Sequence, residues 1–479
     1  MADFSVDVAI IGAGTAGMAA YREALALNRS VLLIEGGSYG TTCARVGCMP
    51  SKLLIAAAEA AHNIRHASVL GVTVGPPAID GVAVMKRVRE ERDRFVGFVL
   101  EAVEGFDPAH KVRARAHFLD DHTLQLSDGR TVTAGSIVIA TGSRPNIPPP
   151  FQHLGGRLVV NDDLFDWQDL PDSVAVFGAG VIGLELGQAL HRLGVRTTLF
   201  GRDHAVGPLT DPVVRQEAMA VFQDEFPFVP HADVISMEAG PDGVTIVYQR
   251  ADGTRGEDRF EHVLVATGRR ANVDTLHLEN TSLTLDGRGV PVFDRLSGQC
   301  GESAIFIAGD ANADVPLLHE AADEGRIAGR NAAKAPEVNR YVRRADLSVV
   351  FSDPQIMMVG ETHGALTARG APFVVGSVDY GDQGRARVML QNKGVLRVYA
   401  EEGTARFLGA EMVGPRAEHI AHLLAWARQS NLSIPEMLER PFYHPVVEEG
   451  VRSALRAALR ALKMGPEPVP RCIDCGPGG

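Results

Sequence analysis

The sequence has few cysteines and no long hydrophobic run, and both absences limit what the protein can be. Its 479 residues include five cysteines, too few for a secreted domain held together by disulfides. No apolar stretch reaches the roughly 18 residues that a membrane-spanning helix needs. The first apolar run, Val6 to Ile11, follows no basic segment and leads into a glycine-rich turn, which predicts a strand and not a signal peptide. We therefore expect a cytoplasmic protein without a membrane partner.

The chain also lacks basic character. Its formal net charge is −12, and it contains no run of lysine and arginine, which argues against a nucleic-acid partner. The length predicts two to four domains with ample core.

Two of the five cysteines, Cys43 and Cys48, lie five residues apart. In a reducing compartment such a pair is more often catalytic or metal-binding than structural. A regular helix would hold their Cα atoms about 7.5 Å apart, beyond the roughly 7 Å that a disulfide tolerates, so the chain must bend between them. Gly47 can supply the bend, and Pro50 fits the first turn of a helix. Cys48 is then predicted at a helix N-terminus, where the dipole favours a thiolate.

A dinucleotide fingerprint precedes this pair. Strands are expected at 6–11 and 30–35, with a helix at 16–27. Gly12, Gly14 and Gly17 stand between the first strand and the helix, where they allow a tight turn, close approach of a pyrophosphate, and packing of the helix on the sheet. Glu35 ends the second strand and can accept hydrogen bonds from a ribose.

The same unit recurs later, with strands expected at 173–177 and 195–200 and a helix at 181–193. Gly178, Gly180 and Gly183 repeat the fingerprint. Gly201 stands where NAD would call for an acid, and Arg202 follows it. Arg202 either neutralises the 2′-phosphate of NADP or is an ordinary surface arginine. We predict that NADPH is used at least as well as NADH.

The remaining segments define the outline of the chain. Helices are expected at 49–65 and 85–103, and linkers at 145–150 and 169–172. After residue 347 the pattern becomes α+β without a phosphate loop, with strands at 349–352, 394–399 and 407–413 and helices at 417–429 and 448–462.

The run Cys-x4-Cys-x-Pro-Ser-Lys, together with the two glycine loops, resembles the class I FAD-dependent pyridine nucleotide-disulfide oxidoreductases, and most of all the dihydrolipoamide dehydrogenases. The resemblance covers nearly the whole chain. It implies a flavin on the first fingerprint and a nicotinamide on the second. It also implies that Cys43 and Cys48 form a redox-active disulfide, with Cys43 meeting the substrate and Cys48 facing the flavin.

Further segments match this family in order, and the resemblance assigns their residues to two cofactor sites. Lys52 and Glu185 match an ion pair near the flavin, where a lysine can stabilise negative charge on the reduced ring. The expected FAD site comprises Gly12, Gly14, Gly17, Glu35, Thr42, Lys52, Ala116, Thr141, Gly142, Asp310 and His319. The expected NAD(P) site comprises Gly178, Gly180, Gly183, Glu185, Arg202 and Gly268. No metal site is expected.

A histidine near the C-terminus completes the expected catalytic set. His444 begins a segment similar to the family's His-Pro-x-x-x-Glu motif. By that resemblance it is the general base for a thiol, and Glu449 orients its imidazole. In the family this histidine serves the partner's disulfide, which implies an obligate homodimer.

The sequence departs from the family pattern at a few positions. Arg45 places a cation between the two thiols, and Val181 stands where glutathione reductase has a tyrosine, which disfavours glutathione as the substrate. Cys472 and Cys475 are either surface thiols of a mobile tail or a shuttle that carries electrons to an outside acceptor. Cys300 is expected to be a buried small hydrophobe.

Together these features predict an α/β fold with two Rossmann-like dinucleotide-binding domains and a C-terminal α+β dimerisation domain. The expected regions are FAD-binding 1–150, NAD(P)-binding 151–272, central 273–345, interface 346–463 and a tail 464–479. The predicted activity is electron transfer between NAD(P)H, FAD, the cysteine pair and a small dithiol or disulfide, free or on a lipoyl or thioredoxin-like carrier protein. Two alternatives are a mercuric- or thioredoxin-reductase-like enzyme that uses the tail cysteines, and a non-catalytic FAD-binding subunit.

Overall fold

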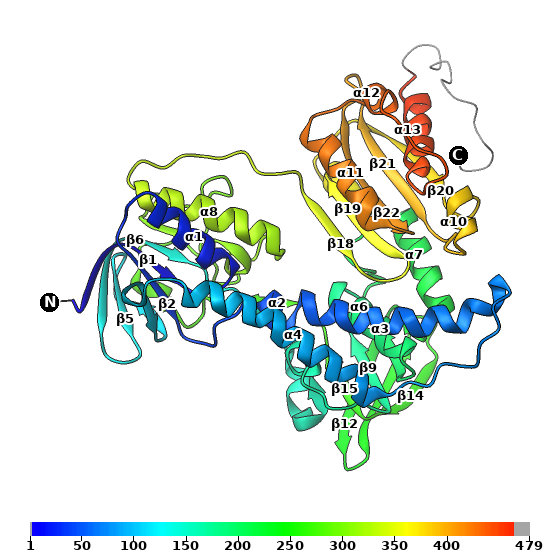
Figure 1. The fold of residues 1–479 in the computed structure, drawn as a ribbon, viewed down its shortest axis with the longest axis horizontal. Helices are drawn as coiled ribbons and strands as arrows, with labels where there is room; N and C mark the ends of the chain where they lie inside the picture. The colour runs from blue at the N-terminus through cyan, green and yellow to red at the C-terminus, as the bar shows by residue number, and fades with distance from the viewer. Residues whose placement is uncertain (1, 464–479) are drawn as a thin grey trace.

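The computed structural model describes residues 2–463, which form three sheet-centred parts joined by a long pair of helices (Figure 1). The first part is built on a seven-stranded sheet in the order β3-β2-β1-β6-β5-β4, with β17 paired to β6. Its strands are β1 (Phe4–Ile11), β2 (Val31–Glu35), β3 (Lys111–Arg113), β4 (Ala116–Phe118), β5 (Thr123–Leu126), β6 (Thr131–Ile139) and β17 (Ile305–Ile307). Because β17 joins this sheet from far along the chain, the segment after residue 272 returns to the first part.

Two helices pack on this sheet, namely α1 (Thr15–Ala26) and α8 (Leu318–Lys334). Their backbones approach closely because α8 carries glycine at the contact. A Cβ on Gly325 would lie 2.2 Å from the Ala16 carbonyl oxygen, and one on Gly329 would lie 2.5 Å from Ala20. The helix that follows the first glycine loop is thus held from behind by α8.

A helical arm links the first part to the second. It consists of α2 (Thr42–Val46), α3 (Cys48–His66) and α4 (Gly81–Glu104). Figure 1 shows α4 crossing from the first sheet at the left toward the second sheet at the lower right, while α3 runs from the centre to the right above the second sheet. The second cysteine of the pair, Cys48, therefore lies at the start of a helix that packs against the second part, which we call the second nucleotide-type unit.

The second part has a five-stranded sheet in the order β11-β10-β9-β15-β8. It comprises β8 (Leu158–Val159), α5 (Asn161–Leu164), β9 (Ser173–Phe177), α6 (Val181–Arg192), β10 (Arg196–Phe200), α7 (Pro212–Glu225), β11 (Phe228–Val229) and β15 (His262–Val265). A meander of β12 (Ala232–Gly240), β13 (Gly243–Arg250) and β14 (Arg255–Phe260) is attached to it. A two-stranded ribbon of β7 (Ser143–Pro145) and β16 (Arg269–Ala271) connects it to the first part.

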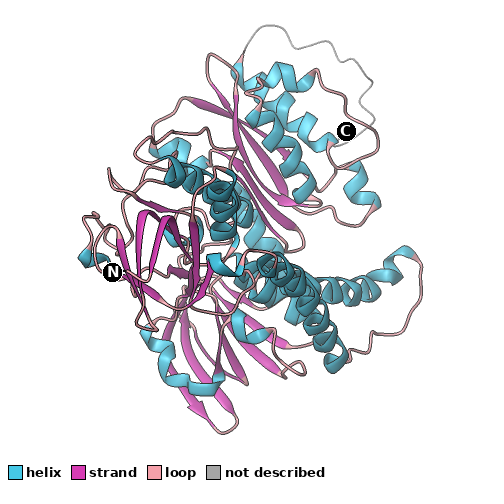
Figure 2. Ribbon diagram, turned by 60° about the vertical axis from the view of Figure 1, so that its left-hand side comes forward, coloured by secondary structure: helices cyan, strands magenta, loops and turns pink. Residues whose placement is uncertain are grey.

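The third part is an antiparallel sheet in the order β18-β19-β22-β21-β20. Its strands are β18 (Leu347–Val350), β19 (Gln355–Gly360), β20 (Phe373–Asp379), β21 (Val395–Glu401) and β22 (Phe407–Gly414). The helices α11 (Ala417–Gln429) and α13 (Glu449–Leu462) cover one face and enclose an apolar core (Figure 2). The other face meets α7 of the second part and the short α9 (His363–Ala368).

Most of the predicted elements are confirmed, and two of them, β9 and α11, match to the residue. Two predictions were wrong in part. The expected linker 145–150 contains the end of β7 and the start of a 3-10 helix at Pro149, because proline suits the first turn of a helix. The strand expected at 349–352 ends at Val350, and Ser352 instead donates its hydroxyl to the Pro354 carbonyl in the loop to β19.

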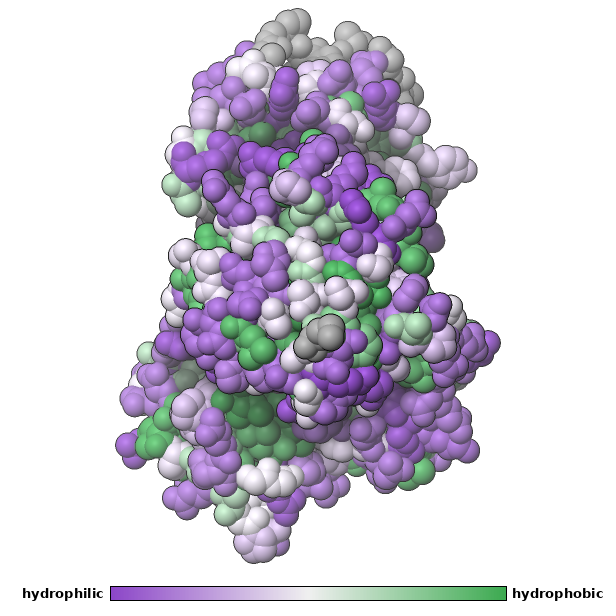
Figure 3. Space-filling model, turned by 90° about the vertical axis from the view of Figure 1, so that its left-hand side faces the viewer, coloured by the Kyte–Doolittle hydropathy of each residue, from purple (hydrophilic) through white to green (hydrophobic). Residues whose placement is uncertain are grey.

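One face of the molecule is mainly polar. Figure 3 shows one face on which hydrophilic side chains dominate and apolar ones form separate groups, with a recessed apolar patch in the lower part. No helix within residues 2–463 is long and apolar enough to cross a bilayer.

Candidate active site

The two cysteines are brought together by a break between two helices. Cys43 lies in α2 and Cys48 is the first residue of α3, and Gly47 between them adopts φ −129° and ψ −115°. A Cβ at Gly47 would lie 3.1 Å from the Thr42 carbonyl oxygen, so a larger residue would crowd the turn. The predicted bend and the helix N-terminal position of Cys48 are both confirmed.

Two residues that the sequence did not single out hold this turn. Thr41 caps α2 by accepting the Ala44 N–H at 3.2 Å. Asn161, which is buried in α5, donates its side-chain amide to the Val46 carbonyl at 2.7 Å. The loop between the cysteines is therefore anchored to the second nucleotide-type unit. A lone asparagine more than a hundred residues away carries no local signal for such a contact.

The two thiols are electrostatically unequal. Both are free in the structure, and the Cys43 thiol donates a hydrogen bond to the Cys48 sulfur. This bond, with a smaller contribution from the Lys52 ammonium, lowers the pKa of Cys48 to about 7, although burial opposes it. The same bond and burial raise the pKa of Cys43 well above its ordinary range. Of the two thiols, Cys48 is therefore the one that ionises first.

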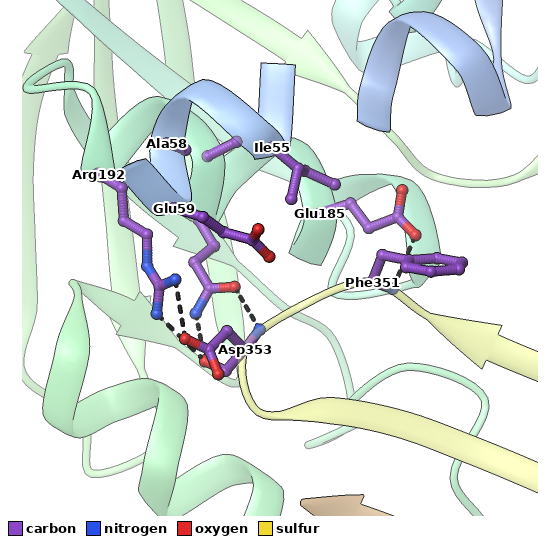
Figure 4. A pocket seen from close by; sticks show the side chains of 9 residues that line it. Ile55, Ala58, Glu59, Glu185, Arg192, Phe351 and Asp353 are labelled. Carbon is purple, nitrogen blue, oxygen red and sulfur yellow. Dashed lines mark hydrogen bonds and ion pairs between the residues drawn. The ribbon is translucent and has the colours of Figure 1, made fainter. Parts of the chain in front are cut away.

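The predicted ion pair between α3 and α6 is present. The Lys52 ammonium lies 2.7 Å from Oε2 of Glu185, whose side chain is 4% exposed. The other carboxylate oxygen accepts the Phe351 N–H at 3.0 Å, and the ammonium lies 4.6 Å from the centroid of the Phe351 ring. Figure 4 shows Glu185 reaching toward this residue at the start of the third part. Phe351 was not anticipated, because nothing in its local sequence marks it.

The first glycine loop has the shape that a dinucleotide needs. A Cβ on Gly12 (φ +108°) would meet the Ala140 carbonyl oxygen at 2.3 Å, and one on Gly17 would meet the Gly12 carbonyl oxygen at 1.8 Å. At Gly14 a Cβ would meet nothing within 4 Å. The outer glycines are therefore required by the protein itself, whereas the middle one leaves space for a ligand.

Two polar side chains beside this loop support the same interpretation. Glu35 accepts the Ala13 N–H at 2.8 Å, so its carboxylate is fixed against the loop where a ribose would lie. The Thr141 hydroxyl is buried and has no hydrogen-bond partner among the described residues. An unpaired buried hydroxyl costs free energy unless a ligand satisfies it. These features fit FAD.

The second glycine loop repeats this geometry. Gly178 (φ +110°) and Gly183 are closely packed, with their virtual Cβ atoms 2.4 Å and 1.8 Å from backbone oxygens, whereas Gly180 faces open space. The loop borders a cavity of about 460 Å³ between the first and second parts. Gly268 and Asp310 line the same cavity. Its size and position suit a nicotinamide nucleotide.

The structure places the remaining residues that were predicted to bind FAD. Asp310 accepts the Ser143 hydroxyl at 2.7 Å and lies 3.9 Å from the Arg269 guanidinium. His319 is in the first turn of α8, near Glu320. The others are Thr42 at the start of α2, Ala116 buried in β4, and Gly142 (φ +69°) before β7.

Arg202 lies just after β10 with its side chain 91% exposed, 3.3 Å from Asp203. The guanidinium is thus free to meet a ligand phosphate at the end of the second nucleotide-type unit. Its geometry is equally that of a surface arginine, so the NADP hypothesis stays a prediction.

His444 and Glu449 are in contact, as the motif predicted. The imidazole Nδ1 lies 3.0 Å from the buried Glu449 carboxylate, which also accepts from Arg452 at 3.1 Å. His444 itself is half exposed. It lies just before α13 in the third part, and Figure 1 shows α13 well separated from α2 of the same chain. One chain therefore does not bring its own histidine to its own cysteine pair.

The other cysteines divide into two groups. Cys300 is fully buried, and burial raises its pKa to about 12, so it is the inert hydrophobe that was predicted. Cys472 and Cys475 lie outside the described residues.

Comparison with known proteins decides the family. The family model described as pyridine nucleotide-disulphide oxidoreductase matches residues 6–325, and the dimerisation domain of the same family matches residues 347–455. The chain belongs to the pyridine nucleotide-disulphide oxidoreductases. Dihydrolipoyl dehydrogenase 2 of Haloarcula marismortui is 31% identical over 465 residues, which are 94% of this chain and 96% of that protein. Dihydrolipoyl dehydrogenase of Geobacillus stearothermophilus is 29% identical, over 95% and 97% of the two chains.

Solved structures of this fold include LpdA from Mycobacterium tuberculosis, with a TM-score of 0.79 and 25% identity over 95% of this chain and all of that one. The flavoprotein disulfide reductase RclA from Escherichia coli has a TM-score of 0.79 and 22% identity over 94% and 99% of the chains.

As a pyridine nucleotide-disulphide oxidoreductase, the protein is an FAD-dependent enzyme that uses NAD(P)H and acts on a sulfur group. Its C-terminal part is a dimerisation domain, which supports a homodimer. The fold, enzyme class and cofactors predicted from the sequence are confirmed. The alternative of a non-catalytic subunit has no support from these relatives.

Proposed function

We propose that the protein is a dihydrolipoyl dehydrogenase-like enzyme that exchanges electron pairs between NAD(P)H and a dithiol such as a lipoyl group, free or on a carrier protein. The active sulfurs are those of Cys43 and Cys48. The observation that carries the proposal is the geometry of the two cysteines: the break at Gly47 brings them together, with Cys48 at the N-terminus of α3 and the Lys52–Glu185 ion pair one turn further along. Dithiol exchange requires one sulfur that attacks the substrate as a thiolate and a second sulfur that resolves the mixed disulfide.

Bound FAD supplies the exchange of an electron pair between the nicotinamide and the sulfur pair. The glycine loops and Glu35 are the proposed holders of FAD and NAD(P), together with the cofactor residues assigned from the sequence. Lys52 provides a fixed positive charge beside Cys48, and Glu185 keeps that ammonium in place.

The sulfur chemistry balances without any further reactant. Two electrons break the Cys43–Cys48 bond. Cys43 takes up one proton and becomes a thiol, and Cys48 becomes a thiolate. Deprotonated Cys43 then attacks a substrate disulfide, forming a mixed disulfide and releasing one substrate thiol with the proton. Cys48 attacks Cys43 in turn, which re-forms the internal bond and releases the second substrate thiolate, protonated by solvent. All steps are reversible, so a dihydrolipoyl group is oxidised by the reverse course.

A base is needed because Cys43 holds its proton tightly. We assign that role to His444 of the partner subunit, oriented by Glu449 through its Nδ1 contact. The ring nitrogen Nε2 is then left to take the proton. The separation of His444 from the cysteines of its own chain supports this assignment to the partner.

Subunit hybrids test the assignment. Cys43→Ser and His444→Ala proteins are each expected to be inactive with lipoamide. Random hybrids of the two should regain about a quarter of the wild-type activity, because half of the dimers contain one complete site. Hybrids no more active than their parents would contradict a base supplied in trans, and a fully active dilute monomer would do so independently.

Two finer proposals accompany this function. NADPH is used at least as well as NADH, through Arg202. The domain bounds are those given by the sequence, at residues 150, 272, 345 and 463. The tail cysteines remain a predicted alternative route to a large acceptor, and removal of the last eight residues should abolish that route while sparing lipoamide.

A further inference from the structure

Two fully buried carboxylates lie where the sheet of the dimerisation domain meets the NAD(P)-type unit. They are Asp211, at the N-cap of α7, and Glu411, in β22. A buried carboxylate is costly unless its oxygens are hydrogen-bonded or paired. The contacts of these two residues therefore indicate what each of them holds in place.

Glu411 is satisfied almost entirely by the segment before α7. Its Oε2 accepts the N–H groups of Thr210 at 2.7 Å and Asp211 at 2.9 Å, and its Oε1 accepts the Thr210 hydroxyl at 2.6 Å. The N–H of His363 donates to Oε1 at 2.9 Å. Within residues 2–463, no cationic side chain forms an ion pair with it. Three of its four hydrogen bonds thus cross from the dimerisation domain to the NAD(P)-type unit.

Asp211 fixes the same segment from the other side. One carboxylate oxygen caps α7 by accepting the Val213 N–H at 2.9 Å. The other accepts from Arg397 at 2.8 Å and from the Tyr399 hydroxyl at 3.0 Å, both on β21. The N-terminus of α7 is therefore pinned to two neighbouring strands of the dimerisation sheet.

This pinned segment touches the second glycine loop. Gly207, three residues before Thr210, donates its N–H to the Ala179 carbonyl at 2.7 Å. In a trans peptide the carbonyl and the following N–H point in opposite directions. The bond from Gly207 therefore turns the N–H of Gly180 away from Gly207. Gly180 is the N-cap of α6, and a Cβ added to it would meet nothing within 4 Å. That N–H is placed to donate to a bound pyrophosphate.

The α6 side of the unit is docked to the same domain. Figure 4 shows the side chain of Arg192 directed at Asp353, in the loop between β18 and β19. Gln188 accepts the Asp353 N–H at 2.8 Å, and Arg192 lies 3.0 Å from its carboxylate. The dimerisation domain thus holds both α6, which follows the glycine loop, and the start of α7.

We propose that Glu411 is a positioning residue for NAD(P)H, because it fixes the segment 207–211 that orients the Ala179–Gly180 peptide toward the nucleotide. The inference rests on the assignment of this loop to NAD(P) and not on the identity of the dithiol substrate. It makes the nucleotide site depend on a carboxylate of the dimerisation domain that touches neither cofactor nor substrate.

The test is nucleotide binding to the FAD-loaded, full-length protein, measured by calorimetry with NAD⁺ and NADP⁺. For Glu411→Gln we expect the dissociation constants of both to rise about tenfold, since a charged acceptor of several hydrogen bonds is weakened. The pH dependence of Cys48 alkylation should not change. A matched control is Glu361→Gln, which alters a partly exposed carboxylate paired with Arg369 in the same domain and should bind as wild type does.

Dissociation constants within twofold of wild type overturn the proposal. This holds even if Glu411→Gln has a lower Tm, because Glu411 would then act on stability alone. If Glu411→Gln does not fold, the decision passes to Thr210→Val. That variant keeps the backbone donor but lacks the hydroxyl that Glu411 accepts, and it should raise both constants about threefold. Unchanged binding there also overturns the proposal. If the wild-type protein binds the nucleotides but does not turn over disulfides, that result would instead contradict the proposed function.

Discussion

The hydrogen bond between the two cysteines makes a quantitative prediction about Cys48. This bond is the largest cause of the lowered Cys48 pKa, with Lys52 contributing less and burial acting against both. Cys43→Ala removes the donor, whereas Cys43→Ser retains a hydroxyl that can donate to the same sulfur. We expect the Cys48 pKa to stay near 7 in the serine variant and to rise by about one pH unit or more in the alanine variant.

The consequence for reactivity follows from the thiolate fraction. At pH 7 about half of Cys48 is ionised when its pKa is about 7, and about a tenth when it is 8. Alkylation of Cys48 by iodoacetamide at pH 7 should therefore be about fivefold slower in Cys43→Ala than in Cys43→Ser.

The sequence allows a clean assay. Trypsin cleaves after Arg45 and Lys52, so Cys48 is released as the single cysteine of the peptide 46–52. Mass spectrometry of that peptide over pH 6 to 10 gives the titration midpoint, free of the tail thiols. Equal midpoints near 9 in both variants would refute the reasoning, because the bond would then have no influence on the thiolate.

Three further outcomes are expected. Gly14→Ala should fold but bind FAD at least about tenfold more weakly, because its Cβ would occupy only the space of the ligand. Gly17→Ala should fail to fold, because its Cβ would lie 1.8 Å from a carbonyl oxygen. Circular dichroism reports the folding of each variant, and visible absorbance reports its bound FAD. Arg202→Ala should raise the KM for NADPH about tenfold and leave that for NADH unchanged, and steady-state rates with a strong, unaltered NADH preference would reject this role. The reduced protein should lose stability as the pH falls from 9 through about 7, because the pKa of Cys48 is lower in the folded state than in the unfolded state; Cys48→Ser should show a flatter Tm profile over that range, and parallel profiles would count against the assignment.

The sequence predicted the parts of the fold that local chemistry determines. The two glycine units were placed correctly because tight turns and helix packing demand glycine at fixed spacing, as at Gly12 and Gly17. The redox turn was predicted because a regular helix would hold the two cysteines too far apart for a disulfide, while Gly47 can supply a bend and Pro50 fits the first turn of the next helix. The contact of His444 with Glu449 was implied by the resemblance of this segment to the family's His-Pro-x-x-x-Glu motif.

What the sequence missed are contacts made over long distances along the chain. The meander β12–β14 was not identified, because its first strand is largely exposed and its residues do not alternate clearly. Asn161 and Phe351 act on the site through a backbone carbonyl and a carboxylate supplied by remote segments. Glu411 looks like an ordinary charge in a strand, and only the packing of β22 against the start of α7 explains it.

The most direct test is to count thiols before and after reduction. The FAD-loaded enzyme is treated anaerobically with one equivalent of NAD(P)H per subunit and then alkylated. We predict that the peptides containing Cys43 and Cys48 are unmodified before reduction and both become modified after it, while the Cys300 peptide stays unmodified. Reduction of the flavin without new thiols at both positions would contradict the claim that this sulfur pair carries the electrons.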